Sequence, residues 1–312
     1  MPPHRGHLYL LDFARSFADS LTVVVGSLKS EPIPGELRYA WMKELLFDTE
    51  VVHLTDENPQ YPHEHPEFWS IWKESLERVC SRKIDLLFCS EEYGRELASV
   101  LGAKFVPTNN GRETYPVSAT QIRNAPLEHW NDIPYPVRPY FTKTVIFFGP
   151  ESTGKSTLSK KLASEIEAAW VSEYARTVLC GRENRFDLDD MVTIARGQQA
   201  SIKAALRIGK PLVFSDTDAL STKLWCEELF GNVPDSVEKL AAEEKPDLTL
   251  LLKPDVPWVE GALRLRPDTR DEFFRRCVEV LDESRREYRI VGGDWSEREI
   301  QAREFIQALP KP

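Results

Sequence analysis

Short apolar segments alternate with amphipathic segments along the whole chain, and this alternation constrains the fold most. Each apolar segment spans five to eight residues, which is typical of strands buried on both faces. Alternating strands and helices form parallel sheets with helices on their faces. We therefore predict an α/β protein. The predicted strands are 21–27, 50–54, 84–90, 104–108, 144–150, 211–216, 247–254 and 288–293, and the predicted helices include 37–47, 68–80, 155–168, 188–208 and 269–287.

A proline-rich segment, NDIPYPVRPYFTK at 131–143, interrupts the alternation. Its three prolines disfavour both a helix and a central strand. A chain of 312 residues is also long enough for two domains. We predict a first parallel-sheet domain at 1–133, a linker at 134–142 and a second parallel-sheet domain at 143–312.

Charge and cysteine usage exclude several classes of protein. The net charge is −10 and no long basic stretch is present, which disfavours a nucleic-acid partner. The five cysteines form no CxxC pair, so we expect reduced thiols and neither a disulfide framework nor a zinc site. No apolar run approaches the ~20 residues that span a bilayer, and no signal peptide is visible. We therefore expect a cytoplasmic protein without a membrane partner.

The segment TVIFFGPESTGKSTLSKKLA carries the strongest motif. Residues 149–156 fit G-x-x-x-x-G-K-[ST], between a predicted strand and a predicted helix. Such a loop wraps backbone N–H groups around phosphates at a helix N-terminus. Lys155 would then reach the β- and γ-phosphates, and Ser156 would bind Mg²⁺. The alternative is a chance Gly/Ser turn, which the flanking strand and helix disfavour.

Acidic residues follow the predicted strand 211–216 and a further short strand that we expect just before Glu173. Asp216 ends the strand PLVFSD, where it can lie beside a metal ion bound at the phosphate loop. Asp218 is either a substrate ligand or a helix N-cap. Glu173 can accept a proton from a substrate hydroxyl, with Arg176 beside it, or it is only the solvated start of a helix.

The stretch PDVPWVEGALRLRPDTR combines three arginines with prolines and glycine. Arg264, Arg266 and Arg270 fit a mobile lid that neutralises a transferring phosphoryl group, and a surface charge run is the alternative. Trp258 in the same stretch either stacks on an aromatic ligand or packs.

In the first domain, His4 and His7 precede an apolar helix. Imidazoles at a helix N-terminus can stabilise negative charge on an α-phosphate. Ser118, Thr120 and Arg123, at the start of a short predicted helix, would form a second phosphate clamp.

Two tryptophans share a face of the predicted helix 68–80. Trp69 and Trp72 are three residues apart, so at least one is expected in the core. The other could stack on a pyridine or adenine ring.

Taken together, these motifs resemble one family, the bifunctional nicotinamide-nucleotide adenylyltransferase/ribosylnicotinamide kinase proteins of the NadR type. The resemblance covers nearly the whole chain. It rests on HRGH (4–7), PIPGELRYAW (32–41), SATQIR (118–123), GPESTGKST (149–157), EYAR (173–176), IARGQQ (194–199), SDTDAL (215–220) and PWV (257–259).

The resemblance implies a Rossmann-like nucleotidyltransferase domain followed by a P-loop kinase domain. The kinase would phosphorylate nicotinamide riboside to the mononucleotide, and the other domain would join the mononucleotide to the AMP of ATP, giving NAD and pyrophosphate. Both reactions need ATP and Mg²⁺. The implied site residues are Gly149, Glu151, Ser152, Thr153, Gly154, Lys155, Ser156 and Thr157 for ATP in the kinase; Ser156 and Asp216 for Mg²⁺; Glu173 and Arg264 for catalysis; Trp258, Asp218, Arg176 and Trp69 for substrate; and His4, His7, Ser118, Thr120 and Arg123 for adenylyl transfer.

The chain departs from the family pattern in three ways. The family has a strand and a glycine-containing loop before HxGH, so we expect an interrupted sheet in the first domain and poor adenylyl transfer. The helix-turn-helix of some members is absent from this sequence, and we expect no repressor activity. The usual lid W-V-x-D-G-x-R is replaced by WVEGALR at 258–264, where Glu260 could substitute for the aspartate.

Three functional hypotheses remain open. The first is the bifunctional enzyme, the second a riboside kinase whose first domain senses NAD without catalysis, and the third a P-loop kinase for another small metabolite. The sequence is compatible with a homo-oligomer and does not identify the kinase base.

Overall fold

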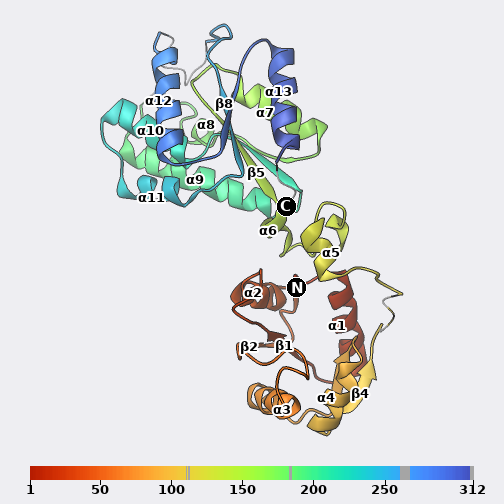
Figure 1. Ribbon diagram of the computed structural model, residues 1–312. Coiled ribbons are helices and arrows are strands. Elements are labelled where there is room, and N and C mark those ends of the chain that lie inside the picture. The colour runs from red at the N-terminus through yellow and green to blue at the C-terminus, as the bar shows by residue number, and fades with distance from the viewer. Residues whose placement is uncertain (110, 112, 183–184, 261–267, 310–312) are drawn as a thin grey trace. The chain divides into compact units, whose positions relative to one another are not determined.

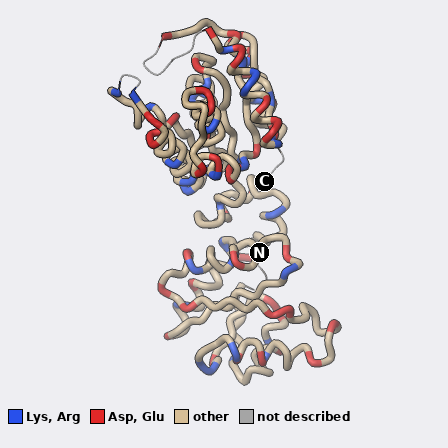
Figure 2. Tube along the Cα trace, turned by 90° about the vertical axis from the view of Figure 1, so that its left-hand side faces the viewer, with Lys and Arg blue, Asp and Glu red and all other residues tan. Residues whose placement is uncertain are grey.

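The computed structural model describes the chain except residues 110, 112, 183–184, 261–267 and 310–312. The chain divides into two compact units, Met1–Val137 and Arg138–Pro312 (Figure 1). This division falls within the proline-rich segment 131–143. Acidic and basic residues are interspersed along the trace of each unit (Figure 2).

The second unit contains a five-stranded parallel sheet in the order β6-β7-β5-β8-β9. Side chains alternate between its faces, as the period of a strand requires. Val145 and Phe147 pack on one face with α7 and α13, whereas Ile146 and Phe148 pack on the other with α9, α10 and α12. The strands are β5 (Lys143–Phe148), β6 (Ala169–Val171), β7 (Leu212–Asp216), β8 (Leu248–Leu252) and β9 (Tyr288–Val291).

Helices cover both faces of this sheet (Figure 1). The helices of this unit are α6 (Arg138–Phe141), α7 (Lys155–Glu165), α8 (Ala175–Val178), α9 (Leu188–Leu206), α10 (Ala219–Phe230), α11 (Asp235–Glu243), α12 (Arg270–Glu283) and α13 (Trp295–Gln307). None of the helices in the described part of the chain is long and apolar enough to cross a membrane. Because the strands are parallel, the segments that follow β5, β6 and β7 meet at one edge of the sheet.

The first unit has two separate two-stranded parallel sheets, β1-β2 and β3-β4. Its elements are α1 (Arg5–Phe17), β1 (Thr22–Gly26), α2 (Gly35–Leu45), β2 (Glu50–Leu54), α3 (Phe68–Val79), β3 (Leu86–Cys89), α4 (Tyr93–Leu101), β4 (Lys104–Pro107), α5 (Ala119–Asn124) and a 3₁₀ turn at Trp130–Asp132. Among the residues described, no strand joins β1 to β3.

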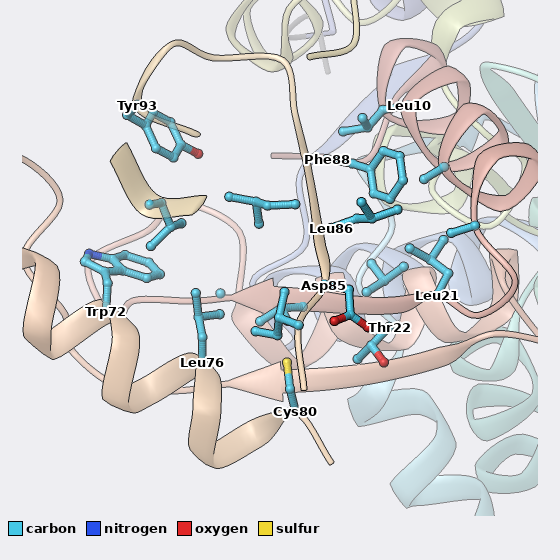
Figure 3. A pocket seen from close by; sticks show the side chains of 18 of the residues that line it. Leu10, Leu21, Thr22, Trp72, Leu76, Cys80, Asp85, Leu86, Phe88 and Tyr93 are labelled. Atoms are coloured by element: carbon cyan, nitrogen blue, oxygen red, sulfur yellow. The ribbon is translucent and has the colours of Figure 1, made fainter. Parts of the chain in front are cut away.

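A cavity of about 1420 Å³ is lined by residues of both small sheets. Thr22 of β1 and Leu86 and Phe88 of β3 face it, together with Trp72 and Leu76 of α3 (Figure 3). Its walls are mostly apolar. The hydrophobic core of this unit is correspondingly divided, with α1 and α2 packed on β1, and α3 and α4 packed beside β2 and β3.

Candidate functional site

The loop between β5 and α7 has the backbone of a phosphate-binding loop. Gly149 has φ +131°, and a Cβ atom there would lie 2.8 Å from the Leu252 carbonyl oxygen. Gly154 has φ +86°, and a Cβ there would lie 2.4 Å from the Trp295 ring. Both positions therefore require glycine. The loop leads directly into α7, whose first N–H groups attract anions.

Buried Arg298 of α13 holds this loop from behind. Its guanidinium donates to the carbonyl oxygens of Thr153, Lys253 and Gly293 at 2.8–2.9 Å and pairs with Asp255. The Lys155 ammonium lies across the loop, 2.8 Å from the Gly149 carbonyl oxygen. The loop is thus held in shape before any phosphate binds, which reduces the entropic cost of binding.

Asp216, the last residue of β7, carries two buried carboxylate oxygens without a hydrogen-bond partner in the described structure. An uncompensated buried carboxylate is costly, and a bound cation would remove that cost. Oxygen ligands from one or two side chains, completed by phosphates and water, suit Mg²⁺. Together with the Ser156 hydroxyl of α7, Asp216 therefore fits a Mg²⁺ ion bound with a nucleotide.

Glu173 follows β6 and pairs with Arg176, whose Nε lies 3.0 Å from Glu173 Oε2. Arg176 also donates to the Ser156 hydroxyl at 3.2 Å, which connects the Glu173 segment to the phosphate loop. Burial raises the pKa of Glu173, and the Asp216 charge raises it further, while Lys155 and Arg176 lower it. A carboxylate with a raised pKa is a better proton acceptor, so Glu173 is suited to act as a general base.

A cavity of about 70 Å³ lies beside Glu173. Seven of its twelve lining residues are apolar or aromatic, and the other five are acidic or carry a hydroxyl group. The lining residues are Glu151, Glu173, Ala175, Leu179, Phe186, Met191, Ile194, Thr217, Ser221, Thr222, Trp225 and Leu229. Trp225, which stacks on Phe273 at 4.4 Å between ring centroids, was missed in the sequence because it lies in a helix interior and outside any motif.

Trp258 does not line this cavity. Its indole lies under the Arg270 guanidinium, 5.7 Å from the ring centroid, and its buried Nε1 has no hydrogen-bond partner in the described structure. The next residue reaches the phosphate loop, because the Val259 amide donates to the Ser152 hydroxyl at 2.8 Å. Arg264 and Arg266 lie outside the described residues.

Asp218 is the N-cap of α10, which agrees with the possibility of a helix cap and not with that of a substrate ligand. Its Oδ1 accepts from the Ser221 amide at 3.0 Å, and its Oδ2 pairs with the buried Arg286. Both oxygens are engaged by the protein, and the side chain is fully buried. A role as substrate ligand is therefore disfavoured.

In the first unit, His4 and His7 form the N-terminal cap of α1. His4 Nδ1 accepts from the Gly6 amide at 3.1 Å, and His7 Nδ1 lies 3.3 Å from the His4 amide. The rings lie 3.9 Å apart. The sequence places the two imidazoles at a helix N-terminus, and the structure agrees.

The second half of the predicted adenylyl-transfer site lies beside this cap. Ser118 caps α5, and Arg123 donates to Thr120 Oγ1 at 3.2 Å and to the Met1 carbonyl oxygen. Tyr115 packs against α1 through Arg5 and Tyr9. Residues more than a hundred positions apart in the sequence thus meet at one place.

Trp69 and Trp72 both pack in the first unit's core and line its large cavity. Trp72 Nε1 also donates to the Pro59 carbonyl oxygen at 2.8 Å.

Residues 144–298 match the protein family described as an AAA domain. Two curated bacterial proteins are similar along 99% of the chain and 81% of their own length. They are the trifunctional NAD biosynthesis/regulator proteins NadR of Escherichia coli strain K12, 29% identical, and of Salmonella typhimurium strain LT2, 27% identical.

Two solved structures share the fold over 99% of this chain and 93% of their own. One is a NadR protein in complex with NR, with a TM-score of 0.81 and 23% identity. The other is a NadR protein in complex with NAD and AMP-PNP, with a TM-score of 0.79 and 24% identity. They support the α/β fold, with parallel sheets in both units.

Proposed function

This chain is a homologue of the NadR proteins along 99% of its length, and from this premise we propose that it is an ATP-dependent kinase for nicotinamide riboside. We propose as its second reaction the adenylyl transfer from ATP to the mononucleotide, giving NAD and pyrophosphate. The observation that carries the kinase proposal is the unpartnered Asp216 carboxylate beside the phosphate loop and the Glu173 cavity.

In the proposed kinase reaction, the backbone N–H groups of the loop and Lys155 hold the phosphates of ATP. Mg²⁺ bound at Asp216 and Ser156 would neutralise phosphate charge. Glu173 accepts the proton of the riboside hydroxyl as its oxygen forms a bond to the γ-phosphorus, and the bond to ADP breaks. Catalysis then consists of positioning, charge neutralisation and one proton transfer.

We propose that the riboside binds at the cavity beside Glu173, whose volume of about 70 Å³ takes only part of such a molecule. Its apolar and aromatic lining suits a flat pyridine ring, and Thr217 and Glu173 supply polar groups for a ribose. A related NadR protein binds NR, which supports this class of substrate.

Adenylyl transfer is proposed for the first unit. His4 and His7 lie at the N-terminus of α1, and Arg123, from the last turn of α5, reaches Thr120 and the Met1 carbonyl oxygen beside it. Negative charge on an α-phosphate would be stabilised there. The interrupted sheet beside the large cavity favours a second candidate, in which this unit binds a nucleotide without catalysis.

Incubation of the protein with nicotinamide riboside, ATP and Mg²⁺, followed by chromatography, tests both reactions. Appearance of NAD supports the bifunctional enzyme, and mononucleotide alone supports the kinase with a non-catalytic first unit. Unchanged riboside would overturn the kinase proposal and point to another small metabolite as the substrate.

The Lys155→Ala variant tests whether the phosphate loop performs the kinase reaction. Because Lys155 neutralises the transferred phosphoryl group, we expect the rate to fall by about a hundredfold or more. Lys160→Ala, five residues along the same helix with its ammonium over Trp170, is the matched control and should keep its activity. Equal rates in the two variants would contradict the role of the loop.

A further inference from the structure

Gln198, in the middle of α9, makes a set of buried hydrogen bonds that the reaction scheme above does not use. Its side chain is 1% exposed. Its Oε1 accepts from the Tyr174 amide at 2.7 Å. Its Nε2 donates to the Ser215 hydroxyl at 3.0 Å and lies 3.3 Å from the Ser172 carbonyl oxygen. One carboxamide thus joins the segment after β6 to the end of β7.

The two segments that Gln198 joins are those that carry the carboxylates of the proposed kinase site. Glu173 lies between Ser172 and Tyr174, both of which bond to Gln198 through their backbone. Asp216 follows Ser215, whose hydroxyl accepts from Gln198 and donates to the Thr217 carbonyl oxygen at 2.7 Å. Neither carboxylate itself contacts the amide, so Gln198 acts on the backbone that holds them.

The end of β7 needs such support because Thr217 has φ +78°. A β-branched residue in this region is strained and persists only where its surroundings hold it. The Thr217 amide donates to the Phe147 carbonyl oxygen at 3.1 Å, and its own carbonyl oxygen lies 3.5 Å from Gln198 Nε2. The strained turn therefore lies between the phosphate-loop strand and Gln198.

Gly197, the residue before Gln198, lets the Tyr174 ring of the Glu173 segment pack directly against α9. A Cβ atom on Gly197 would lie 2.0 Å from the Tyr174 ring, so this ring rests directly on the helix backbone. Gly197 thus receives the Tyr174 ring while Gln198 binds the Tyr174 amide. This gives a physical role to the sequence motif IARGQQ, which the reaction scheme leaves unexplained.

We infer that Gln198 is a positioning residue for phosphoryl transfer, which holds the Glu173 and Asp216 segments in register with the phosphate loop. The inference rests on the proposed kinase function. It predicts a loss in kcat rather than in ATP affinity, because the loop itself is held from the other side by Arg298.

The test compares Gln198→Met with Gln199→Met. Methionine keeps the volume of glutamine and removes its hydrogen bonds. Gln199, the adjacent residue, accepts only a surface hydrogen bond from Lys203 among the contacts described, and provides the matched control. For Gln198→Met we expect kcat to fall about tenfold to a hundredfold with the KM for ATP within about threefold, since misplaced catalytic groups slow the chemical step. Gln199→Met should match the wild type.

Hydrogen exchange supplies a second readout that does not depend on the substrate. Because the Tyr174 amide donates to Gln198, the peptide containing residues 172–178 should exchange faster in Gln198→Met and not in Gln199→Met. Exchange in β5 and β8 should stay unchanged. If the wild type does not phosphorylate the riboside, the kinase proposal fails, and this exchange pattern still decides whether Gln198 holds the segment.

The inference is overturned if Gln198→Met retains the kcat of Gln199→Met, or if its exchange rises uniformly across the second unit. Should Gln198→Met fail to fold, Ser215→Ala removes a single partner of the amide. It should lower kcat in the same direction by a smaller factor, and an unchanged kcat would count against the inference.

Discussion

At the scale of single residues, the buried Asp216 carboxylate serves the proposed function and lowers the stability of the folded protein. Its two buried oxygens have no partner in the described structure, which destabilises the folded state. We expect Asp216→Asn to lose about a hundredfold or more in kinase rate, because the proposed metal ligand is gone. The same variant should melt at an equal or higher temperature than the wild type without Mg²⁺. Thermal unfolding with and without Mg²⁺ and ATP measures both effects.

Asp235→Asn is the control for this prediction, because Asp235 lies exposed in the first turn of α11. It should leave the rate unchanged. If Asp216→Asn melted well below the wild type, its carboxylate would have a structural partner, contrary to the geometry.

At the scale of an element, the N-terminus of α10 contains a buried charge cluster that makes stability depend on pH. Glu244 Oε2 accepts from the Ala219 amide at 3.0 Å. Burial, and then the Asp218 charge, raise the pKa of Glu244 from 4.5 to about 7. The folded state therefore binds the Glu244 proton more tightly than the unfolded state does. The protonated Glu244 carboxyl adds to the free energy of unfolding in full below about pH 4.5, and this stabilisation is lost as pH rises through about 7. Glu244→Gln keeps the acceptor and removes the titration.

We therefore expect the stability of the wild type to fall more than that of Glu244→Gln between pH 6 and pH 8.5, by roughly 1 kcal/mol. Urea unfolding of both proteins at the two pH values measures the difference. Glu243→Gln, at the exposed neighbour that pairs with Lys239, should follow the wild type. Parallel pH dependences for the wild type and Glu244→Gln would rule out this role.

At the scale of the whole molecule, the two units differ in how their cores are built. The second unit has one continuous sheet with a core on each face, whereas the first has two small sheets beside a cavity of about 1420 Å³.

We expect two unfolding transitions, the first unit melting first. Leu11→Ala should lower the melting temperature of the first unit only, and Leu250→Ala that of the second unit only. Each substitution should reduce the free energy of unfolding of its own unit by about 2–5 kcal/mol. Kinase activity should persist between the transitions, and its loss with the first would show that the kinase depends on both units.

The local sequence determined where most of the strands, helices and loops of this protein form. The strands, the phosphate loop and the starts of α1 and α5 lie where the sequence predicts them, because each depends on a few neighbouring residues and the preferences of the backbone. The caps that His4 and Ser118 form at those starts appear only in the structure. The resemblance to NadR proteins, carried by short motifs in order, is confirmed along 99% of the chain.

Tertiary structure decided what distant segments do to one another. Asp218 could cap a helix or bind substrate by sequence, and only the buried Arg286, 68 residues away, resolves the choice. Arg298 behind the phosphate loop, Gln198 behind Glu173, and Trp225 in the cavity carry no local signal, because their roles come from partners that folding brings near. A motif indicates that a loop can bind phosphate, whereas only the tertiary structure shows which charged and apolar side chains surround the bound phosphate.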